Sequence, residues 1–331
     1  MIENDIILNV VKLKKYFPVK KRGLLSFSRR RDYVRAIDDI SFNLEKSEIL
    51  GLAGESGCGK TTTGRVILRL TDPTAGEVFF KGINLFSIKK REFKNYRRQM
   101  QMIFQDPYES LNPRRTVEET IRQPIEIHNL VQNEDEKKDL IFKTLEEVEL
   151  KPPTEFLNRY PHMLSGGQRQ RLAISRAIVL RPKIIIADEP VSMLDVSTRS
   201  GILSLIEKLR KDMEISYIYI THDLATAKYI CDRVAIMYLG KIVEIGATKK
   251  IITEPLHPYT QALISAVPVP DPKTKIGEIP IKGEVPLNQI EIISGCRFHP
   301  RCPIATERCR KDEPGLSQAE GDHHVACYLN N

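Results

Sequence analysis

The stretch Ile49-Leu50-Gly51-Leu52-Ala53-Gly54-Glu55-Ser56-Gly57-Cys58-Gly59-Lys60-Thr61-Thr62 decides the fold of this chain. An apolar run typical of a buried strand leads into a glycine-rich turn, and residues from Thr61 to Leu70 then favour a helix. The glycines of the turn let the backbone wrap around phosphate oxygens with its N–H groups pointing inward. The stretch is therefore a P-loop, also called a Walker A motif, and it predicts a nucleotide site.

Each residue of this loop has an expected role in that site. Lys60 is expected to reach the β- and γ-phosphates, and the Thr61 hydroxyl is expected to help hold Mg²⁺. The alternative is a glycine turn beside a buried lysine. The other predicted nucleotide contacts in the loop are Gly54, Glu55, Ser56, Gly57, Cys58, Gly59 and Thr62.

A second glycine-rich segment, Leu164-Ser165-Gly166-Gly167-Gln168, lies far downstream. A helix N-terminus that follows such a turn offers free N–H groups and the positive end of the helix dipole to an anion. The chain therefore has two predicted places for phosphate on distant segments. The simplest arrangement is two copies of the domain that sandwich ATP between the P-loop of one copy and the Ser165 turn of the other.

Polar residues follow three further apolar strands. Asp188 and Glu189 end one of them, at the edge of a parallel sheet where ligands bind. Asp188 is expected to help hold Mg²⁺ through water or through another ligand, and Glu189 to polarise the attacking water, although such a pair can also cap a helix. His222 follows the strand ending at Thr221 and is a candidate phosphate sensor. Gln105 is expected to contact Mg²⁺ or water.

The alternation of strands and helices predicts an α/β core with a parallel sheet, a P-loop NTPase (RecA-like) fold. We expect an ATPase domain at residues 1–250, into which a helical subdomain at about 96–165 is inserted. Prolines recur from Pro255 onward, and residues 251–331 are expected to form a small cysteine-rich extension.

The composition is ordinary for a globular protein, with 41% hydrophobic and 28% charged residues among 331. No apolar run approaches the roughly 18–20 residues that span a bilayer, and the N-terminus lacks a signal-peptide charge pattern. We therefore expect a cytosolic protein that meets a membrane through a partner or by lying on its surface. The net charge of +8 comes partly from basic runs within residues 20–31, which favour a solvated loop, with anionic lipid or nucleic acid as alternatives.

Four of the six cysteines lie in the C-terminal tail, at Cys296, Cys302, Cys309 and Cys327. Four thiolates in one small segment suit Zn²⁺ or an iron–sulfur cluster. Their spacings are longer than those of common structural zinc sites, which disfavours zinc. Free or disulfide-linked thiols are the remaining alternative.

The motifs resemble, in their order and spacing over residues 6–250, those of the ATP-binding subunit of an ABC transporter. The resemblance implies that Ser165, Gly166, Gly167 and Gln168 contact ATP held by the other subunit, and that Asp195 communicates across the dimer interface. It also implies an aromatic residue that stacks on adenine; Phe17 fits best, and Tyr16 is the alternative.

The segments Gln105–Arg114 and His257–Leu263 and the cysteine tail resemble the dipeptide/oligopeptide import branch of that family. This resemblance implies that the four tail cysteines hold a [4Fe–4S] cluster, with Zn²⁺ as the alternative. It implies a second ABC ATPase subunit, a paralogue or an identical chain, and two transmembrane permease subunits. An extracytoplasmic peptide-binding protein would take part indirectly, and the chain would lie at the cytoplasmic face of the cell membrane. Nickel is the alternative substrate.

A soluble ABC ATPase that acts on the ribosome or on nucleic acid is the alternative function. That class predicts two fused cassettes or a long coiled coil, and the sequence has one cassette and neither feature. We therefore expect no nucleic-acid partner. A third hypothesis makes the cysteine tail a redox-sensing module that regulates the ATPase.

Overall fold

The computed structural model describes residues 5–19, 32–89, 91–266, 281, 283 and 293–329. The chain divides into two compact units. Unit 1 comprises Met1–Asp5, Glu45–Ile49 and Ser87–Tyr219, and unit 2 comprises Ile6–Leu44, Leu50–Phe86 and Ile220–Asn331.

Unit 1 is built on short strands whose residues are almost all apolar. Strands β6 (Met100–Ile103) and β7 (Ile184–Asp188) pair in parallel, with Ile103 opposite Ala187, and β8 (Ser216–Thr221) follows β7 in the strand order. Every residue of β7 and β8 is buried. Continuous apolar runs are typical of strands covered on both faces, so the sequence pattern and the structure agree here.

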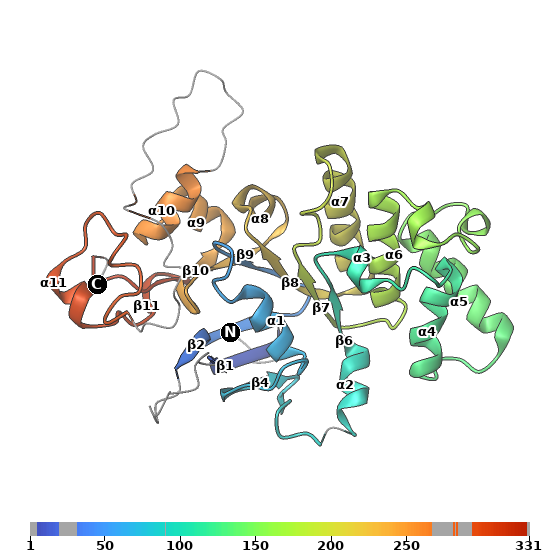
Figure 1. The fold of residues 1–331 in the computed structure, drawn as a ribbon, viewed down its shortest axis with the longest axis horizontal. Helices are drawn as coiled ribbons and strands as arrows, with labels where there is room; N and C mark the ends of the chain where they lie inside the picture. The colour runs from blue at the N-terminus through green and yellow to red at the C-terminus, as the bar shows by residue number, and fades with distance from the viewer. Residues whose placement is uncertain are drawn as a thin grey trace, which may run out of the picture. The chain divides into compact units, whose positions relative to one another are not determined.

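Helices make up the rest of unit 1. Helix α4 begins at a capping box, in which Thr116 Oγ1 accepts the Glu119 N–H at 3.2 Å and the Glu119 carboxylate accepts the Thr116 N–H at 2.8 Å. Helices α4, α5 and α6 pack on one another, and α6 also packs against α7 and β6 (Figure 1). The helices are α2 (Phe93–Gln99), α3 (Pro107–Ser110), α4 (Val117–Ile127), α5 (Glu134–Glu147), α6 (Gly166–Ile178), α7 (Val196–Met213) and the 3₁₀ turns η2 (Pro153–Glu155) and η3 (Pro161–Met163).

Unit 2 contains two groups of strands. The first, in the order β2-β1-β4-β5, comprises β1 (Ile6–Pro18), β2 (Tyr33–Glu45), β4 (Ala75–Phe80) and β5 (Ile83–Asn84). The second, in the order β11-β12-β10-β9-β3, comprises β3 (Ile49–Ala53), β9 (Arg233–Tyr238), β10 (Lys241–Ala247), β11 (Ser317–Glu320) and β12 (His323–Val325). Strands β3 and β9 are parallel, whereas β9 and β10 form an antiparallel hairpin. The helices are α1 (Lys60–Ile67), α8 (Leu224–Ile230), α9 (Thr248–Thr253), α10 (Pro258–Ser265) and α11 (Glu307–Lys311).

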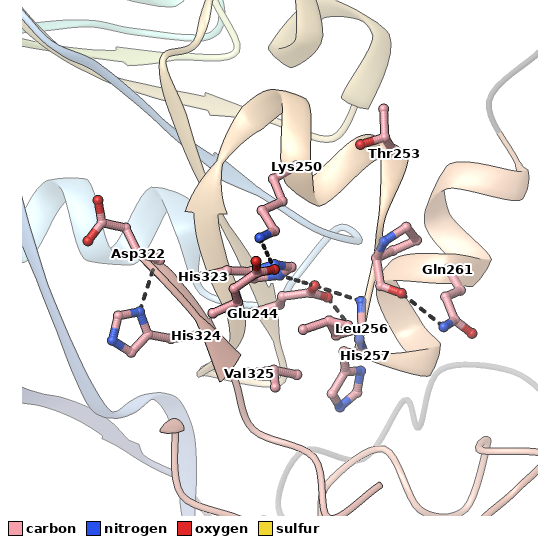
Figure 2. Close-up of polar contacts among 12 residues, drawn as sticks. Glu244, Lys250, Thr253, Leu256, His257, Gln261, Asp322, His323, His324 and Val325 are labelled. Carbon is pink, nitrogen blue, oxygen red and sulfur yellow. Dashed lines mark hydrogen bonds and ion pairs between the residues drawn. The ribbon is translucent and has the colours of Figure 1, made fainter. Parts of the chain in front are cut away.

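The end of the chain is attached to unit 2 through a buried acidic side chain. Strand β12 pairs antiparallel with β10, and His323 Nε2 lies 2.7 Å from an oxygen of Glu244, whose side chain is 0% exposed. The same carboxylate accepts the backbone N–H groups of Leu256 and His257 at 2.8 and 3.0 Å (Figure 2). A buried carboxylate is tolerated when partners satisfy its oxygens. Glu244 thus fixes both β12 and the chain that enters α10.

Candidate nucleotide-binding site

The P-loop connects the end of β3 to the start of α1 in unit 2, as the sequence predicts. Gly59 is the N-cap of α1 and has φ +107°, and a Cβ at this position would lie 2.1 Å from the Ala36 carbonyl oxygen. A Cβ on Gly54 would lie 2.2 Å from the Met237 carbonyl oxygen. Because neighbouring backbone lies this close to the loop at both glycines, a residue with a Cβ atom does not fit at either position.

Lys60 places its positive charge inside this loop. Its side chain is 5% exposed, and Nζ donates to the carbonyl oxygens of Gly54 and Glu55 at 2.7 and 2.9 Å. Cys58 lies beside it, and burial raises the pKa of that thiol even though the Lys60 charge acts to lower it. A protonated thiol is a poor nucleophile, so the loop offers a cation and backbone N–H groups rather than a reactive cysteine.

Two residues of the C-terminal part of unit 2 hold the loop at Glu55. The Glu55 N–H donates to Tyr259 Oη at 2.9 Å. Arg301 donates from Nη1 and Nη2 to the two carboxylate oxygens of Glu55, at 2.8 and 3.1 Å. A two-point guanidinium–carboxylate pair is among the stronger and more directional polar contacts. The sequence predicted neither contact. The segment His257–Leu263 resembled the family, but no contact was assigned to it. No feature of the sequence indicated a role for Arg301.

An aromatic cluster surrounds this contact. The ring centroids of Tyr238, Tyr259 and Phe298 lie 4.7 to 5.4 Å apart, and the Arg301 guanidinium lies 5.8 Å from the Tyr238 ring. All three aromatic residues are at most 1% exposed. Burial raises the pKa of Tyr259, so its phenol stays neutral at physiological pH. The cluster therefore gives Arg301 and Tyr259 a rigid, dry setting.

The two candidates for adenine stacking differ in their surroundings. The Tyr16 hydroxyl donates to Asp38, and burial together with this hydrogen bond raises the pKa of Tyr16 to about 12. Phe17 is 39% exposed, and the Lys15 ammonium lies 4.8 Å from its ring centroid. Tyr16 is thus engaged in a polar network, whereas Phe17 presents more free ring surface.

Unit 1 brings together the predicted residues at the ends of β6 and β7. Gln105 Nε2 donates to a Glu189 oxygen at 3.1 Å, because the two strands are parallel and in register. Asp188, 2% exposed, is the last residue of β7, and Glu189 has φ +45° just beyond it. The Gln105 amide and the Glu189 carboxylate therefore meet at the strand ends that the sequence analysis indicated, and Asp188 directly precedes Glu189 in the chain.

The Ser165 turn has the predicted helix N-terminus. Ser165 is the N-cap of α6; its Oγ accepts the Gln168 N–H at 3.3 Å, and Gln168 Oε1 accepts the Ser165 N–H at 3.0 Å. Gly167 is packed so closely that a Cβ would lie 2.5 Å from Thr198 Cγ2. Gly166, between them, is the first residue of the helix.

Arg169 holds the backbone that leads into this turn. It is 4% exposed, and it donates to the carbonyl oxygens of Pro161 and Leu164 at 2.9 and 2.8 Å. Its guanidinium lies 3.7 Å from the centroid of the Tyr108 ring. Sequence reasoning missed this residue, because an arginine on a helix is usually exposed.

The remaining candidates lie at helix or strand ends. Asp195 is the N-cap of α7, where it accepts the Thr198 N–H at 2.9 Å and hydroxyls from Ser197 and Thr198 at 2.6 and 2.8 Å. These hydrogen bonds hold the pKa of Asp195 well below its usual range. His222 is exposed directly after β8, in unit 2, and Thr61 and Thr62 are half-buried in the first turn of α1.

The four tail cysteines all lie in unit 2 as free thiols. Burial and the charges of the other three cysteines raise the pKa of Cys296 to about 11, so the four thiols are near enough to influence one another. Across the described part of the chain, however, no group of three or more His, Cys, Asp or Glu side chains is arranged to hold a metal ion. The described residues therefore do not by themselves show the metal centre expected from the sequence, and burial raises the pKa of Cys327 as well.

Comparison with protein families gives two matches along the chain. Residues 37–192 match the model described as ABC transporter, and residues 243–309 match that of the oligopeptide/dipeptide transporter C-terminal region. The oligopeptide transport ATP-binding protein AppF of Bacillus subtilis is 44% identical over 98% of this chain and 98% of its own length. The dipeptide transport ATP-binding protein DppF of Haemophilus influenzae is 43% identical over 98% and 97%.

The chain belongs to the oligopeptide/dipeptide family of ABC transporter ATP-binding proteins. The family resemblance drawn from the motifs is thereby confirmed, as is the ABC-type P-loop α/β fold. A solved dimeric ATP-binding cassette in a post-hydrolysis state, bound to ADP and Pi, is 28% identical. It aligns with a TM-score of 0.63 over 73% of this chain and 98% of that chain. Within the described residues of this family member, no helix is long and apolar enough to cross a membrane.

Helix α10, which carries Tyr259 to the P-loop, begins directly after the buried residue His257. The burial of this histidine predicts that the stability of the fold depends on pH. His257 is 1% exposed and caps α10, since its Nδ1 accepts the Tyr259 N–H at 3.1 Å, and burial lowers its pKa from 6.5 to about 3. The unfolded chain therefore binds a proton at higher pH than the folded chain. The stabilisation from neutral His257 is complete above pH 6.5 and is lost as the pH falls toward 3, by up to about 1.4 kcal/mol for each pH unit.

The variant His257→Asn tests this, because asparagine also caps helices but does not titrate. In urea unfolding between pH 4 and 8, the free energy of unfolding should change less with pH for the variant than for the natural chain. The other ionisable groups are common to both proteins and cancel in the difference. Parallel curves would show that His257 is not buried in its neutral form.

Proposed function

We propose that this chain binds and hydrolyses ATP to energise the import of dipeptides or oligopeptides through an ABC transporter complex. The observation that carries the proposal is the P-loop geometry, with Lys60 buried among loop carbonyls at the start of α1, in a chain whose C-terminal region matches the peptide-transporter family. The named peptide transport proteins AppF and DppF support peptides over nickel as the substrate class.

The P-loop residues are proposed to hold the ATP phosphates through backbone N–H groups and the Lys60 ammonium. Thr61, Asp188 and Gln105 are proposed to hold Mg²⁺, because hydroxyl, carboxylate and amide oxygens are the ligands that this ion prefers. The Gln105 amide suits this role, since its nitrogen donates to Glu189 and its oxygen is the atom that would face a cation. When bound, Mg²⁺ neutralises charge on the phosphates.

Glu189 is proposed as the base of the reaction. Its carboxylate orients a water molecule and takes a proton from it as the water oxygen bonds to the γ-phosphorus. The bond between that phosphorus and the oxygen bridging to the β-phosphate breaks, and ADP leaves with the electron pair. The hydrogen bond from Gln105 fixes one oxygen of the Glu189 carboxylate. His222 is proposed to contact the γ-phosphate, and Phe17, with Tyr16 as the alternative, to stack on adenine.

The Ser165 turn is proposed to complete the site of a second ATP-binding subunit. The α6 N-terminus directs N–H groups at an anion, and Ser165, Gly166, Gly167 and Gln168 supply that surface. Asp195 is proposed to communicate across the dimer. The second subunit is a paralogue or an identical chain, two permease subunits form the transmembrane path, and a peptide-binding protein delivers substrate outside. The chain would then lie at the cytoplasmic face of the membrane, with the ATPase domain at 1–250, its helical subdomain at 96–165 and the extension at 251–331.

The substitution Glu189→Gln separates ATP binding from hydrolysis. Steady-state ATPase activity should fall by about 10²-fold or more, because the amide cannot accept the proton of water. ATP binding should persist, and gel filtration with ATP should show a trapped dimer. Glu207→Gln, at a half-buried glutamate of α7 that pairs with Arg210 and Lys211, is the matched control and should hydrolyse ATP at the natural rate.

The same variant tests the transport function in proteoliposomes that contain the assembled complex. ATP-driven uptake of a labelled dipeptide or oligopeptide should stop with Glu189→Gln and continue with the control. Hydrolysis by the variant at the natural rate would remove Glu189 from the role of base. Uptake of nickel but not of peptides by the natural complex would overturn the peptide assignment.

We propose further that Cys296, Cys302, Cys309 and Cys327 hold a [4Fe–4S] cluster. Four thiols from one tail have the donor chemistry for such a cluster, and a cluster of several irons needs thiols that are farther apart than a single ion does. Zn²⁺ is the alternative, which the long spacings between the four cysteines disfavour. A bound cluster would offset the burial cost that raises the Cys296 pKa, since metal ions favour the thiolate.

Anaerobic purification tests the cluster directly. The chain should carry about four irons and four sulfides, as the cluster formula requires, and Cys302→Ser should lose most of the iron. Cys231→Ser is the control, because Cys231 is buried near Gly51 and outside the tail, and it should keep the iron. Stoichiometric zinc, or a metal-free protein with natural ATPase activity, would contradict the proposal.

A further inference from the structure

The segment from Cys296 to Cys302, named here the cysteine segment, extends two arginines to nucleotide-binding elements of unit 2. Arg301 forms the two-point ion pair with Glu55 of the P-loop and is itself 6% exposed. Arg297 donates to the Asp38 carboxylate and to the Leu239 carbonyl oxygen. Neither arginine belongs to a nucleotide-binding motif.

Glu55 is the point at which the P-loop is held most completely. Its N–H donates to Tyr259, its carbonyl oxygen accepts from Lys60 Nζ, and its carboxylate is bound by Arg301. Backbone donor, backbone acceptor and side chain are thus all engaged, and two of the three partners come from the C-terminal part of the chain. The position of Glu55 sets the course of the loop, because it directly follows Gly54.

Arg297 holds a second support of the same loop. The Leu239 carbonyl that it binds lies in the β9–β10 turn, and the next residue, Gly240, donates its N–H to the Cys58 carbonyl oxygen at 2.9 Å. The other Arg297 partner, Asp38, also accepts from Tyr16 and from Arg35. Burial acts to raise the pKa of Asp38, but the Tyr16 hydrogen bond and the Arg297 charge outweigh it, so the pKa is lowered and the carboxylate stays ionised.

Tyr259, the remaining support, is positioned by the buried network of Glu244. The carboxylate holds the N–H groups of Leu256 and His257, and His257 in turn accepts the Tyr259 N–H (Figure 2). His323, four residues before Cys327, binds the same carboxylate. The contact of α10 with the P-loop therefore depends on the same tail that carries the cysteines.

We propose that Arg301 is a positioning residue for ATP binding, and that the cysteine segment holds the P-loop in its phosphate-binding conformation through Arg301 and Arg297. The inference rests on the proposed ATPase function. Phosphate binding requires several loop N–H groups to converge, and a loop freed at Glu55 must be ordered at the moment of binding, which weakens affinity. Any change in the segment, including gain or loss of a group bound by its cysteines, is then transmitted to the affinity for ATP.

The test uses the purified full chain and a fluorescent ATP analogue. Arg301→Gln and Glu55→Gln should each weaken binding about tenfold, as expected for loss of a charge-assisted two-point contact. The double variant should be no more than about twofold worse than either single variant, because both remove the same interaction. In ATPase assays KM should rise while kcat stays within about twofold, since the residue does not touch the reacting atoms.

Two further variants complete the design. Arg310→Gln is the matched control, because Arg310 lies in the same tail with its side chain 60% exposed and pairs only loosely with Glu307, at 3.7 Å; it should bind ATP normally. Arg301→Lys keeps the charge but loses the two-point geometry, and it should weaken binding about threefold. It carries the same test if Arg301→Gln does not fold.

The inference would be overturned if the Arg301 and Glu55 variants bound the ATP analogue as tightly as the natural chain. It would also be overturned if the losses of affinity in the two single variants multiplied in the double variant. Either result leaves the ATPase function standing, because the natural chain still binds ATP. Failure of the natural chain itself to bind the analogue would instead overturn the proposed function.

Discussion

The ion pair between Arg301 and Glu55 ties a loop near the start of the chain to a segment near its end. These residues are 246 positions apart, yet the guanidinium meets both oxygens of the carboxylate. The contact is well shielded, with the side chain of Arg301 7% and that of Glu55 26% exposed, so solvent weakens it less than an exposed pair. The aromatic cluster, the Tyr259 hydrogen bond and the cysteine segment are all arranged around it. The nucleotide-binding unit therefore includes the extension as one of its structural parts.

Buried charge recurs in both units, and for three such residues the partners are known. Lys60 is held by loop carbonyls, Arg169 by the carbonyls that precede the Ser165 turn, and Glu244 by two N–H groups and His323. A charge that is removed from water is costly unless partners replace the water. Each such residue therefore fixes the backbone around it, which is what a phosphate site made of N–H groups requires.

Local sequence rules predicted the parts of the fold that depend on near neighbours. Strands β7 and β8 were predicted correctly from their apolar runs, because buried strands are rich in apolar residues. The P-loop was predicted correctly from its glycines, because neighbouring backbone comes too close for a larger residue. The helix start after Ser165 was also predicted, whereas its capping hydrogen bonds and the contact of Gln105 with Glu189 were not. The roles of these residues in catalysis remain predictions.

Contacts between distant segments were not predictable in this way. Nothing in the residues around Arg301 indicates Glu55 as its partner, and the pairing of β12 with β10 adds a three-residue strand too short to give a periodic pattern. Arg169 resembles an exposed helical arginine until the carbonyls of Pro161 and Leu164 are placed beside it. The four tail cysteines predicted a metal site, but the described residues contain no group of side chains arranged to hold a metal ion, so the cluster stays a proposal.

Amide hydrogen exchange of the P-loop in the full chain tests the central claim most directly, namely that the extension keeps this loop in shape. Peptides that cover residues 54–60 should exchange faster in Arg301→Gln than in the natural chain, while peptides from α6 in unit 1 should be unchanged. Equal exchange of the P-loop peptides in the two proteins would contradict the account, because the loop would then hold its conformation without Arg301.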